Sequence, residues 1–337
     1  MTSRWTRNEG CSMTVHQRSS PRLFAGIDIG TLTCRLLIAE VTSSGTLRER
    51  HADRRILRLG QGVDRDRMLR IDAVERVVET LKEWCSVMDG YELAAYTAVA
   101  TSAVRDAGNR DEFVNVVRER TGLQVEIISG EEEARRTMLG IRSGLPADVN
   151  DVLALDIGGG STEFILHRPV LAPLVRSIDI GVVRLCERVL HHDPPAGDEV
   201  RQAREWVRNE TAAAVADLAL PVGVTFVGTA GTITALAALA QQLPAYEPAR
   251  IHNYRLARMV VQDMESMLLA RTKAERAGLP GLERNREDVI AAGAIILRTV
   301  METVGMPSLL VSDLGLREGV LIDLANRLSQ DQADPHH

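Results

Sequence analysis

Two stretches of the chain resemble each other, and their shared pattern constrains the fold more than any other feature of the sequence. Residues 24–39 and residues 152–166 each contain an apolar run, the tripeptide Asp-Ile-Gly, a few small residues and a second apolar run. Asp28 and Asp156 occupy equivalent places in the two stretches. Apolar runs on both sides of a turn rich in Gly, Ser and Thr predict a β-hairpin. The repeat therefore predicts two similar halves, each beginning with such a hairpin.

Helical periodicity follows the first hairpin and continues through the chain. Residues 72–89 carry Val74, Val77, Leu81 and Trp84 at spacings of three and four, which predicts an amphipathic helix. Comparable patterns predict helices at residues 111–120, 130–142, 198–218, 231–242, 253–270 and 287–304, and strands at residues 96–100, 125–128, 224–227 and 308–311. Because strands alternate with helices, we predict an α/β fold.

A cluster of turn-forming residues marks the boundary between the two halves. Gly144, Pro146 and Asn150 lie close together there. We therefore predict an N-terminal lobe at residues 22–145 and a C-terminal lobe at residues 146–330. Residues 1–21 are polar and lack the apolar core of a signal peptide, so they are predicted to be a disordered extension. Residues 331–337 are predicted to be a tail.

Composition excludes several classes of protein. The net charge of −6, the pI near 5.8 and an aromatic content of 3% argue against a nucleic-acid-binding protein. No apolar run reaches the length of a membrane span, so no membrane partner is expected. The four cysteines are far apart and match neither a zinc site nor a disulfide framework, which indicates a reduced, cytoplasmic setting.

The turn of the second repeat is the strongest candidate for an anion site. Three consecutive glycines bring backbone N–H groups close to a ligand, and two hydroxyl side chains follow: Gly158, Gly159, Gly160, Ser161 and Thr162. The alternative is a glycine-rich hairpin turn without a ligand. The flanking strands and the partial copy in the first half favour phosphate binding.

Carboxylates flank both turns. Asp156 and Glu163 would suit a hard cation such as Mg²⁺ (or Mn²⁺), held directly or through water, and Asp28 occupies the equivalent place in the first half. In that half Gly30 and Thr31 form a weaker copy of the phosphate loop, for which an ordinary hairpin turn is the alternative.

A third small-residue loop follows the strand predicted at residues 224–227 and opens a helix. It contains Gly228, Thr229, Gly231 and Thr232. A helix N-terminus offers free N–H groups and the positive end of the helix dipole to an anion. The alternative is a tight connection that needs small residues for packing.

Two charged segments have plain structural explanations. Ser129 is predicted to cap a helix with Glu132 closing a capping box, and acidic residues belong in a first helical turn, so the residues alone favour a structural role for Glu132 and Glu133. Arg105 follows a strand, where it would either clamp a phosphate or be ion-paired. The pair His191 and His192 is interpreted as part of a solvated loop rather than a metal site.

Together these segments resemble the exopolyphosphatase/guanosine pentaphosphatase family of the actin, sugar-kinase and chaperone-ATPase superfamily. The resemblance spans residues 24–324 and rests on seven motifs in the family's order: residues 28–31, 57–60, 100–105, 128–134, 156–163, 228–232 and 312–319. It implies two actin-like (ribonuclease H-like) lobes with an active-site cleft between them. It also implies inorganic polyphosphate or guanosine pentaphosphate as substrate, a part in the stringent response, and a homodimer.

The resemblance reverses the structural interpretation of the acidic cluster. The family's water-orienting base matches Glu133, with Glu132 as second choice, while its loop arginine matches Arg105 and its metal-associated aspartate matches Asp156. This chain departs from the family at Leu32, where a polar residue of the first loop is common, which predicts an altered chain-length or nucleotide preference. Longer members carry a C-terminal HD-like domain that is absent before His337, so the resemblance is to the short form.

Two other classes remain open. One is an ATP-using phosphotransferase of the same superfamily, which would need an acceptor site and an adenosine pocket. The other is a non-catalytic regulator that binds ppGpp without turnover, for which the changed first loop leaves room.

Overall fold

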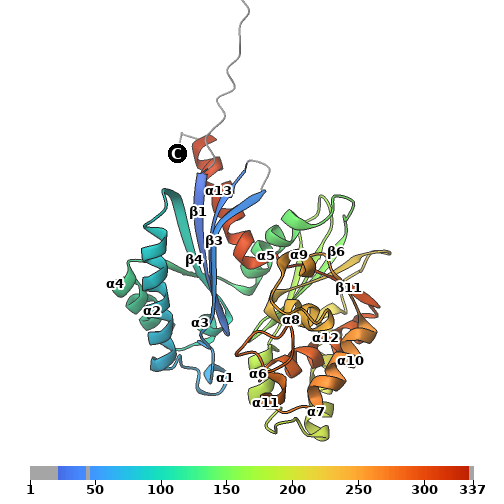
Figure 1. Ribbon diagram of the computed structural model, residues 1–337. Helices are drawn as coiled ribbons and strands as arrows, with labels where there is room; N and C mark the ends of the chain where they lie inside the picture. Colours follow the sequence, from blue (N-terminus) through green and yellow to red (C-terminus); the bar gives the residue numbers. More distant parts are fainter. Residues whose placement is uncertain (1–21, 43–45, 334–337) are drawn as a thin grey trace, which may run out of the picture.

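The computed structural model describes residues 22–42 and 46–333, and these residues form two lobes, each built on one mixed β-sheet (Figure 1). The strands of the first sheet are β1 (Arg22–Ile29), β2 (Thr33–Val41), β3 (Leu47–Ile56), β4 (Leu93–Ala100) and β5 (Val125–Ile127). Those of the second sheet are β6 (Val152–Ile157), β7 (Thr162–His167), β8 (Leu174–Ile178), β9 (Thr225–Thr229), β10 (Arg255–Ala257) and β11 (Ser308–Val311).

Helices connect the strands and cover the sheets. In the first half these are α1 (Val63–Asp66), α2 (Ile71–Met88), α3 (Ser102–Asp106), α4 (Arg110–Thr121) and α5 (Gly130–Gly144). In the second half they are α6 (Val182–Arg188), α7 (Gly197–Val215), α8 (Ala230–Ala240), α9 (Pro248–Ile251), α10 (Arg258–Leu269), α11 (Lys273–Arg276), α12 (Ile290–Val304) and α13 (Leu316–Ala333).

The two sheets have the same topology. The first has the order β3-β2-β1-β4-β5, and the second has β8-β7-β6-β9-β11 with β10 added at its edge. In each, the opening hairpin is antiparallel and the next strand pairs in parallel with the first strand of that hairpin. A parallel neighbour needs a crossover, which helices supply. The repeat predicted from the two Asp-Ile-Gly stretches is thus confirmed as two ribonuclease H-like lobes of the actin type.

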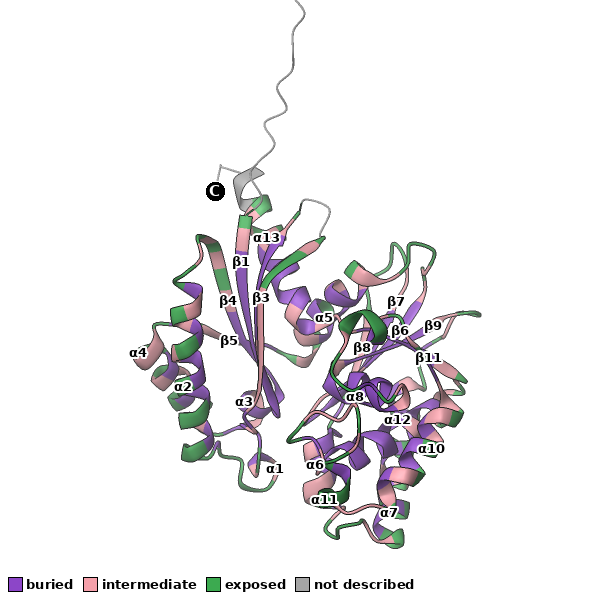
Figure 2. Ribbon diagram, viewed as in Figure 1, coloured by how far each residue is buried: buried purple, intermediate pink, exposed green. Residues whose placement is uncertain are grey.

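Each sheet is covered by helices on both faces, and the buried residues lie along the interfaces between the layers (Figure 2). In the first lobe, α2 and α4 contribute Trp84 and Phe113 to a core against one face of the sheet. In the second lobe, α12 lies at the centre of the helical layer, and most of its residues are buried. Burial on nearly every side explains why its sequence is apolar almost throughout.

The last helix crosses back to the first lobe. The division predicted from the sequence assigns α13 to the second half, yet its side chains Leu321 and Leu324 pack on Phe24 and Leu37 of the first sheet. Figure 1 shows this C-terminal helix beside the N-terminal strands. Helix α5, in contrast, packs on the second sheet, with Ala134 among the contacting residues. Each sheet is therefore covered on one face by a helix from the other half of the chain: α13 covers the first sheet, and α5 covers the second.

Helices α5 and α13 cross at very short range. A Cβ atom on Gly140 would lie 1.9 Å from the carbonyl oxygen of Gly315, and one on Gly319 would lie 1.7 Å from that of Arg136. Only glycine allows two helix backbones to approach this closely. This crossing joins the two lobes.

Most predicted helices and strands are confirmed within a few residues, but one assignment is wrong. Residues 253–270 were predicted to be a single helix, whereas strand β10 occupies 255–257 and α10 begins at Arg258. Leu256 is buried at this sheet edge, where pairing with β11 outweighs helical periodicity. The sequence analysis also missed β3, β8, α6 and the long C-terminal helix α13, together with the short helices α1, α3, α9 and α11. The predicted extension at 1–21 and most of the predicted tail lie outside the described residues. None of the helices within the described ranges combines the length and apolarity needed to cross a bilayer.

Candidate active site

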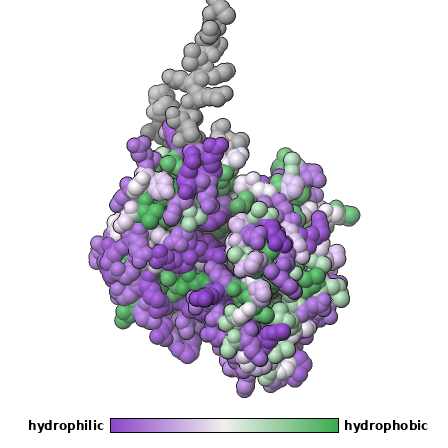
Figure 3. All heavy atoms as spheres, viewed as in Figure 1, coloured by the Kyte–Doolittle hydropathy of each residue, from purple (hydrophilic) through white to green (hydrophobic). Residues whose placement is uncertain are grey.

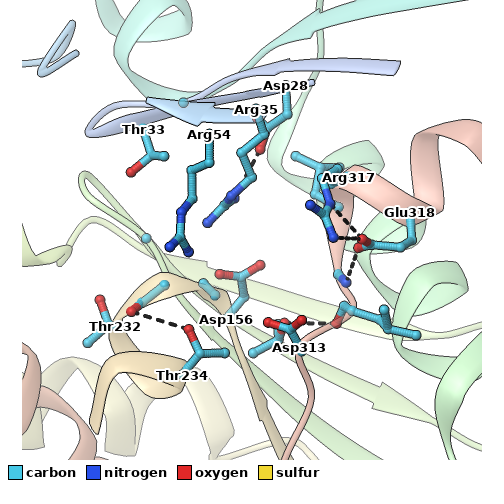
Figure 4. Close-up of a pocket in the computed structure, with 18 of the residues that line it drawn as sticks. Asp28, Thr33, Arg35, Arg54, Asp156, Thr232, Thr234, Asp313, Arg317 and Glu318 are labelled. Carbon is cyan, nitrogen blue, oxygen red and sulfur yellow. Dashed lines mark hydrogen bonds and ion pairs between the residues drawn. The ribbon is translucent and has the colours of Figure 1, made fainter. Parts of the chain in front are cut away.

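A cleft of about 590 Å³ lies between the lobes and is lined by residues of both. The space-filling view shows a hollow between the lobes on the face drawn, and mostly hydrophilic residues cover the first lobe there (Figure 3). In the close-up, Arg35 and Arg54 extend from the first lobe toward Asp156 of the second (Figure 4). Oxygen and guanidinium groups thus face each other across the cleft.

Strand periodicity brings Asp28 to the cleft. Ala25, Ile27 and Ile29 of β1 point into the core beneath α2 and α4, so the alternate residues point to the opposite face. On that face α13 covers the early part of the strand and leaves Asp28 at the cleft. Its cross-strand partner is Arg35, whose Nη1 donates to Asp28 Oδ2 at 3.1 Å. Burial raises the pKa of Asp28, and Arg35 opposes that effect.

The second hairpin repeats this geometry, but the cross-strand partner of its aspartate carries the opposite charge. Alternate residues of β6 pack beneath α5, and Asp156 continues that face into the cleft. Its cross-strand partner is Glu163, which occupies the place that Arg35 has in the first hairpin. Burial and then the like charge of Glu163 raise the pKa of Asp156 to about 7. Glu163 is itself buried beneath the cleft and accepts a hydrogen bond from Ser177 at 2.9 Å.

Glu133 lies on the cleft wall, one turn into α5. Ser129 caps this helix by accepting a hydrogen bond from the N–H of Glu132, as predicted. Arg105 of α3 donates to Glu133 Oε2 at 3.1 Å and to the carbonyl of Ile128 at 3.0 Å. Burial, followed by the nearby charge of Glu163, raises the pKa of Glu133 well above its ordinary value. A carboxylate with a raised pKa beside a cleft is suited to accept a proton at neutral pH.

Glu132 points away from the cleft, although it adjoins Glu133. It accepts hydrogen bonds from Arg135 at 2.8 Å and from the buried Arg136 at 2.6 Å. These ion pairs, the hydrogen bond from Arg135 first, lower the pKa of Glu132 to about 2. The predicted capping box does not form, because this carboxylate binds the two arginines instead of the N-cap amide.

The glycine-rich turn touches the first lobe. A Cβ on Gly159 would lie 2.8 Å from Cβ of Thr31, and one on Gly160 would lie 2.3 Å from the hydroxyl of Ser102. A side chain at either position would push the lobes apart. These glycines therefore permit close approach of the two lobes as well as exposing backbone amides to the cleft.

The third loop begins α8 as predicted and carries the same kind of constraint. A Cβ on Gly231 would lie 2.4 Å from Nη2 of the buried Arg286. This Nη2 atom also lies 3.5 Å from the hydroxyl oxygen of Thr33 in the first lobe. Thr229 donates to the carbonyl of Leu314 at 2.9 Å. Gly228 lies beneath the loop, against apolar side chains.

Most of the predicted site residues line one cleft: Asp28, Gly30, Thr31, Glu133, Asp156, Gly158, Gly159, Gly160, Ser161, Thr229, Gly231 and Thr232. Four others lie behind or beside this wall: Arg105, Thr162, Glu163 and Gly228. Glu132 points away from the cleft. Sequence reasoning had found the loops that converge here, although Asp28 and Thr232 are 204 positions apart in the chain.

Several charged residues of the cleft were missed, notably Arg35, Arg54, Arg286, Asp313 and Arg317. Arg35 had a signal in the sequence, since it stands seven residues after Asp28 just as Glu163 stands seven after Asp156. A hairpin with a fixed turn makes those pairs cross-strand neighbours. Arg54 belongs to the missed strand β3, pairs with Glu283 at 3.0 Å and lies 4.8 Å from the centre of the Tyr246 ring.

Leu32 packs across the lobe interface. Its side chain is buried and belongs to the apolar core of the second lobe, together with Ile157 and Val182. The departure from the family's polar first loop therefore adds an apolar contact between the lobes.

The carboxylates of the cleft fit a magnesium ion held partly by substrate. Among the described residues no three His, Cys, Asp or Glu side chains converge to form a metal cage of protein ligands alone. Mg²⁺ is commonly bound by one or two carboxylates together with substrate phosphates and water. Asp156 suits this arrangement, because no described side chain forms an ion pair with it, and the nearby Glu163 and Asp28 add negative charge that Arg35 opposes.

Two actin-like lobes that face each other across a polar cleft define the structural class of this chain. The model of the Ppx/GppA phosphatase family matches residues 37–328, so the chain belongs to that family of enzymes, as the sequence motifs predicted. Exopolyphosphatase 2 of Mycobacterium tuberculosis is 37% identical over 314 residues, which cover 89% of this chain and 98% of the relative.

Solved structures agree with the family match. The crystal structure of the Aquifex aeolicus family member aligns with a TM-score of 0.78 and 33% identity, covering 91% of this chain and 99% of that one. An exopolyphosphatase from Cytophaga hutchinsonii aligns with a TM-score of 0.82 and 25% identity, covering 90% and 98%.

Proposed function

We propose that this protein is an exopolyphosphatase, which hydrolyses the terminal phosphate of inorganic polyphosphate. The observation that carries the proposal is Glu133, a buried carboxylate with a raised pKa on the wall of a cleft formed by three small-residue loops. The mycobacterial relative that is 37% identical bears the name exopolyphosphatase 2. The cleft arginines supply positive charge for an anionic chain, although the whole protein is acidic.

In the proposed reaction, the backbone amides near Gly30, Gly158 and Gly231 bind the terminal phosphoryl group. Glu133 orients a water molecule and takes its proton as the water oxygen attacks phosphorus, while the bond to the bridging oxygen breaks. Orthophosphate and a chain shorter by one phosphate are the products. Arg105 holds the carboxylate of Glu133 in place through the 3.1 Å contact.

Asp156 would hold Mg²⁺ or Mn²⁺, with Asp28 and Glu163 adding negative potential nearby. When bound, the ion supplies positive charge beside the phosphoryl oxygens. The same ion would relieve the repulsion between Asp156 and Glu163, which is, after burial, the second cause of the raised pKa of Asp156.

A second substrate, guanosine pentaphosphate, is favoured by one arm of the cleft. Toward the β2–β3 hairpin the cleft is lined by Leu37, Ala39, Leu47 and Ala52, and Arg317 lines the same cleft. Polyphosphate has no apolar surface to place there, whereas a nucleoside does. We therefore include the conversion of pppGpp to ppGpp in the proposed activity.

The first experiment measures phosphate release from short polyphosphate, long polyphosphate, pppGpp and ATP in the presence of Mg²⁺. Glu133→Gln should lower kcat by about 100- to 10,000-fold while the protein folds normally, because the variant lacks the base but keeps its shape. Glu132→Gln is the matched control and should retain turnover. Full activity in Glu133→Gln would disprove the role of Glu133. Turnover of ATP with transfer to a small acceptor, or tight ppGpp binding without turnover of any substrate, would replace the proposal by one of the two other classes.

We also infer a cytoplasmic location, which the free thiols of Cys34, Cys85 and Cys186 support. The homodimer and the lack of a nucleic-acid or membrane partner stay predictions.

A further inference from the structure

Arg184 connects the two lobes behind the cleft. It lies on α6 of the second lobe, and its side chain is buried. Its guanidinium group lies 2.7 Å from Asp106 and 3.1 Å from Asp64, both of the first lobe. A third carboxylate, the exposed Asp179 of its own lobe, lies 3.0 Å away. Two of the three charges that compensate this buried cation therefore belong to the opposite lobe.

The helix that carries Arg184 also holds the glycine-rich turn. The N–H of Val182 donates to the carbonyl of Gly158 at 3.0 Å, and the N–H of Val183 donates to that of Gly159 at 2.9 Å. A Cβ on Gly181 would lie 2.3 Å from the carbonyl carbon of Gly159, so the helix start and the turn are packed backbone to backbone. A displacement of α6 would therefore displace the turn.

On the other side, Arg184 reaches the helix that carries Arg105. Asp106 follows Arg105 directly at the end of α3, a helix of only five residues. Arg105 in turn donates to Glu133. A continuous series of hydrogen bonds and ion pairs thus runs from the glycine-rich turn through Arg184 and Asp106 to the side chain that holds Glu133.

Further contacts of α6 with the first lobe strengthen this connection. Arg188 binds Asp64 through two hydrogen bonds of 2.5 and 2.7 Å, and Glu187 accepts a hydrogen bond from the N–H of Gly62 at 2.8 Å. Residues 184, 187 and 188 share one helical face, because they are three and four positions apart. Opening of the lobes would break these contacts and leave Arg184 with only the exposed Asp179 as its charged partner.

We propose that Arg184 is a positioning residue, which couples closure of the lobes to the placement of Arg105 and Glu133 against the glycine-rich turn. The guanidinium group is suited to this task, because its planar fork can bind several carboxylates at once, whereas a lysine ammonium is a single point charge. Arg184 does not line the cleft and is not expected to contact substrate. The inference rests on the proposed hydrolysis for its kinetic consequence.

The test compares Arg184→Lys and Asp106→Asn with the wild-type protein. Both variants should lower kcat by roughly 10- to 100-fold, the effect expected of a small misplacement of catalytic groups, and should leave KM within about twofold. Asp66→Asn is the matched control, because Asp66 lies two residues after Asp64 on the same helix but is exposed and pairs with Arg65 of the same lobe. It should leave both constants unchanged.

A purely structural role would give a different result. It would lower the stability and the yield of folded protein but leave kcat per folded molecule unchanged in both variants, and that outcome would overturn the proposal. Asp106→Asn provides a second test if Arg184→Lys fails to fold, since it retains Arg184 and the two other carboxylates that pair with it.

Hydrogen exchange separates this inference from the proposed function. In Arg184→Lys, the amides of residues 101–106 and of the α6 start should exchange faster than in wild type, whereas Asp66→Asn should leave them unchanged. If wild-type protein releases no phosphate from any substrate, the proposed function fails, and the hydrogen-exchange result alone tests the coupling role of Arg184. Unchanged exchange at residues 101–106 would then overturn the coupling role of Arg184.

Discussion

Replacing Asp156 by Asn should stabilise the metal-free protein at neutral and alkaline pH. The side chain is buried next to Glu163, and burial followed by that like charge raises its pKa from 3.8 to about 7. Asn has nearly the same shape and no charge. The substitution therefore removes the cost of ionising a carboxyl group in this environment.

The size and the pH window follow from the two pKa values. Below about pH 3.8 the carboxyl group is protonated in both the folded and the unfolded protein, so ionisation costs nothing. Between 3.8 and about 7 the unfolded chain releases the proton while the folded protein retains it, so the free energy of unfolding falls as pH rises. Above pH 7 the full cost remains, at most about 4 kcal/mol for this difference in pKa.

Urea unfolding with a chelator present, at about pH 4 and about pH 8, measures this effect. Asp156→Asn should match wild type at the lower pH and exceed it by up to about 4 kcal/mol at the higher pH. Added Mg²⁺ should stabilise wild type at the higher pH and have little effect on the variant. An equal difference between variant and wild type at both pH values would refute the argument, since it would mean that ionisation of Asp156 costs nothing on folding.

Two further predictions concern α5. Gly319→Ala should lower the free energy of unfolding by about 3 kcal/mol or more in urea titrations, because the new Cβ would lie 1.7 Å from the backbone carbonyl oxygen of Arg136. A loss below about 0.5 kcal/mol would contradict the close crossing of α5 and α13. Glu132→Gln should lower the free energy of unfolding by about 1–3 kcal/mol, because the negative charge and one of the two oxygens that accept from Arg135 and Arg136 are lost, yet keep kcat within about twofold. Loss of turnover with unchanged stability would assign Glu132, rather than Glu133, to the chemistry.

The repeat of two Asp-Ile-Gly stretches predicted much of the fold. It predicted two hairpins with equivalent aspartates, and the structure confirms both hairpins and the equivalent cleft positions of Asp28 and Asp156. The prediction succeeded because a hairpin is local: turn composition and apolar alternation determine it over about 15 residues. The helix at 253–270 was wrong at its start, because a buried sheet edge outweighed the periodicity of the sequence.

The different surroundings of Glu132 and Glu133 show where sequence reasoning stops. Both are acidic residues in the first turn of one helix, and local rules assign them the same task. The direction of each side chain depends on what packs against the helix. Glu132 meets Arg135 and Arg136, and Glu133 meets Arg105 at the cleft.

The sequence by itself determined the α/β architecture, the small-residue loops of the cleft and the family, because these depend on short contiguous patterns. Only the tertiary structure decided that α13 returns to the first sheet, that Leu32 packs in the second lobe, and that Arg184 meets Asp64 and Asp106. Those contacts join residues that are about 80 to 300 positions apart, and no local periodicity encodes them. They form because buried apolar surface and buried charge must find partners wherever the fold supplies them.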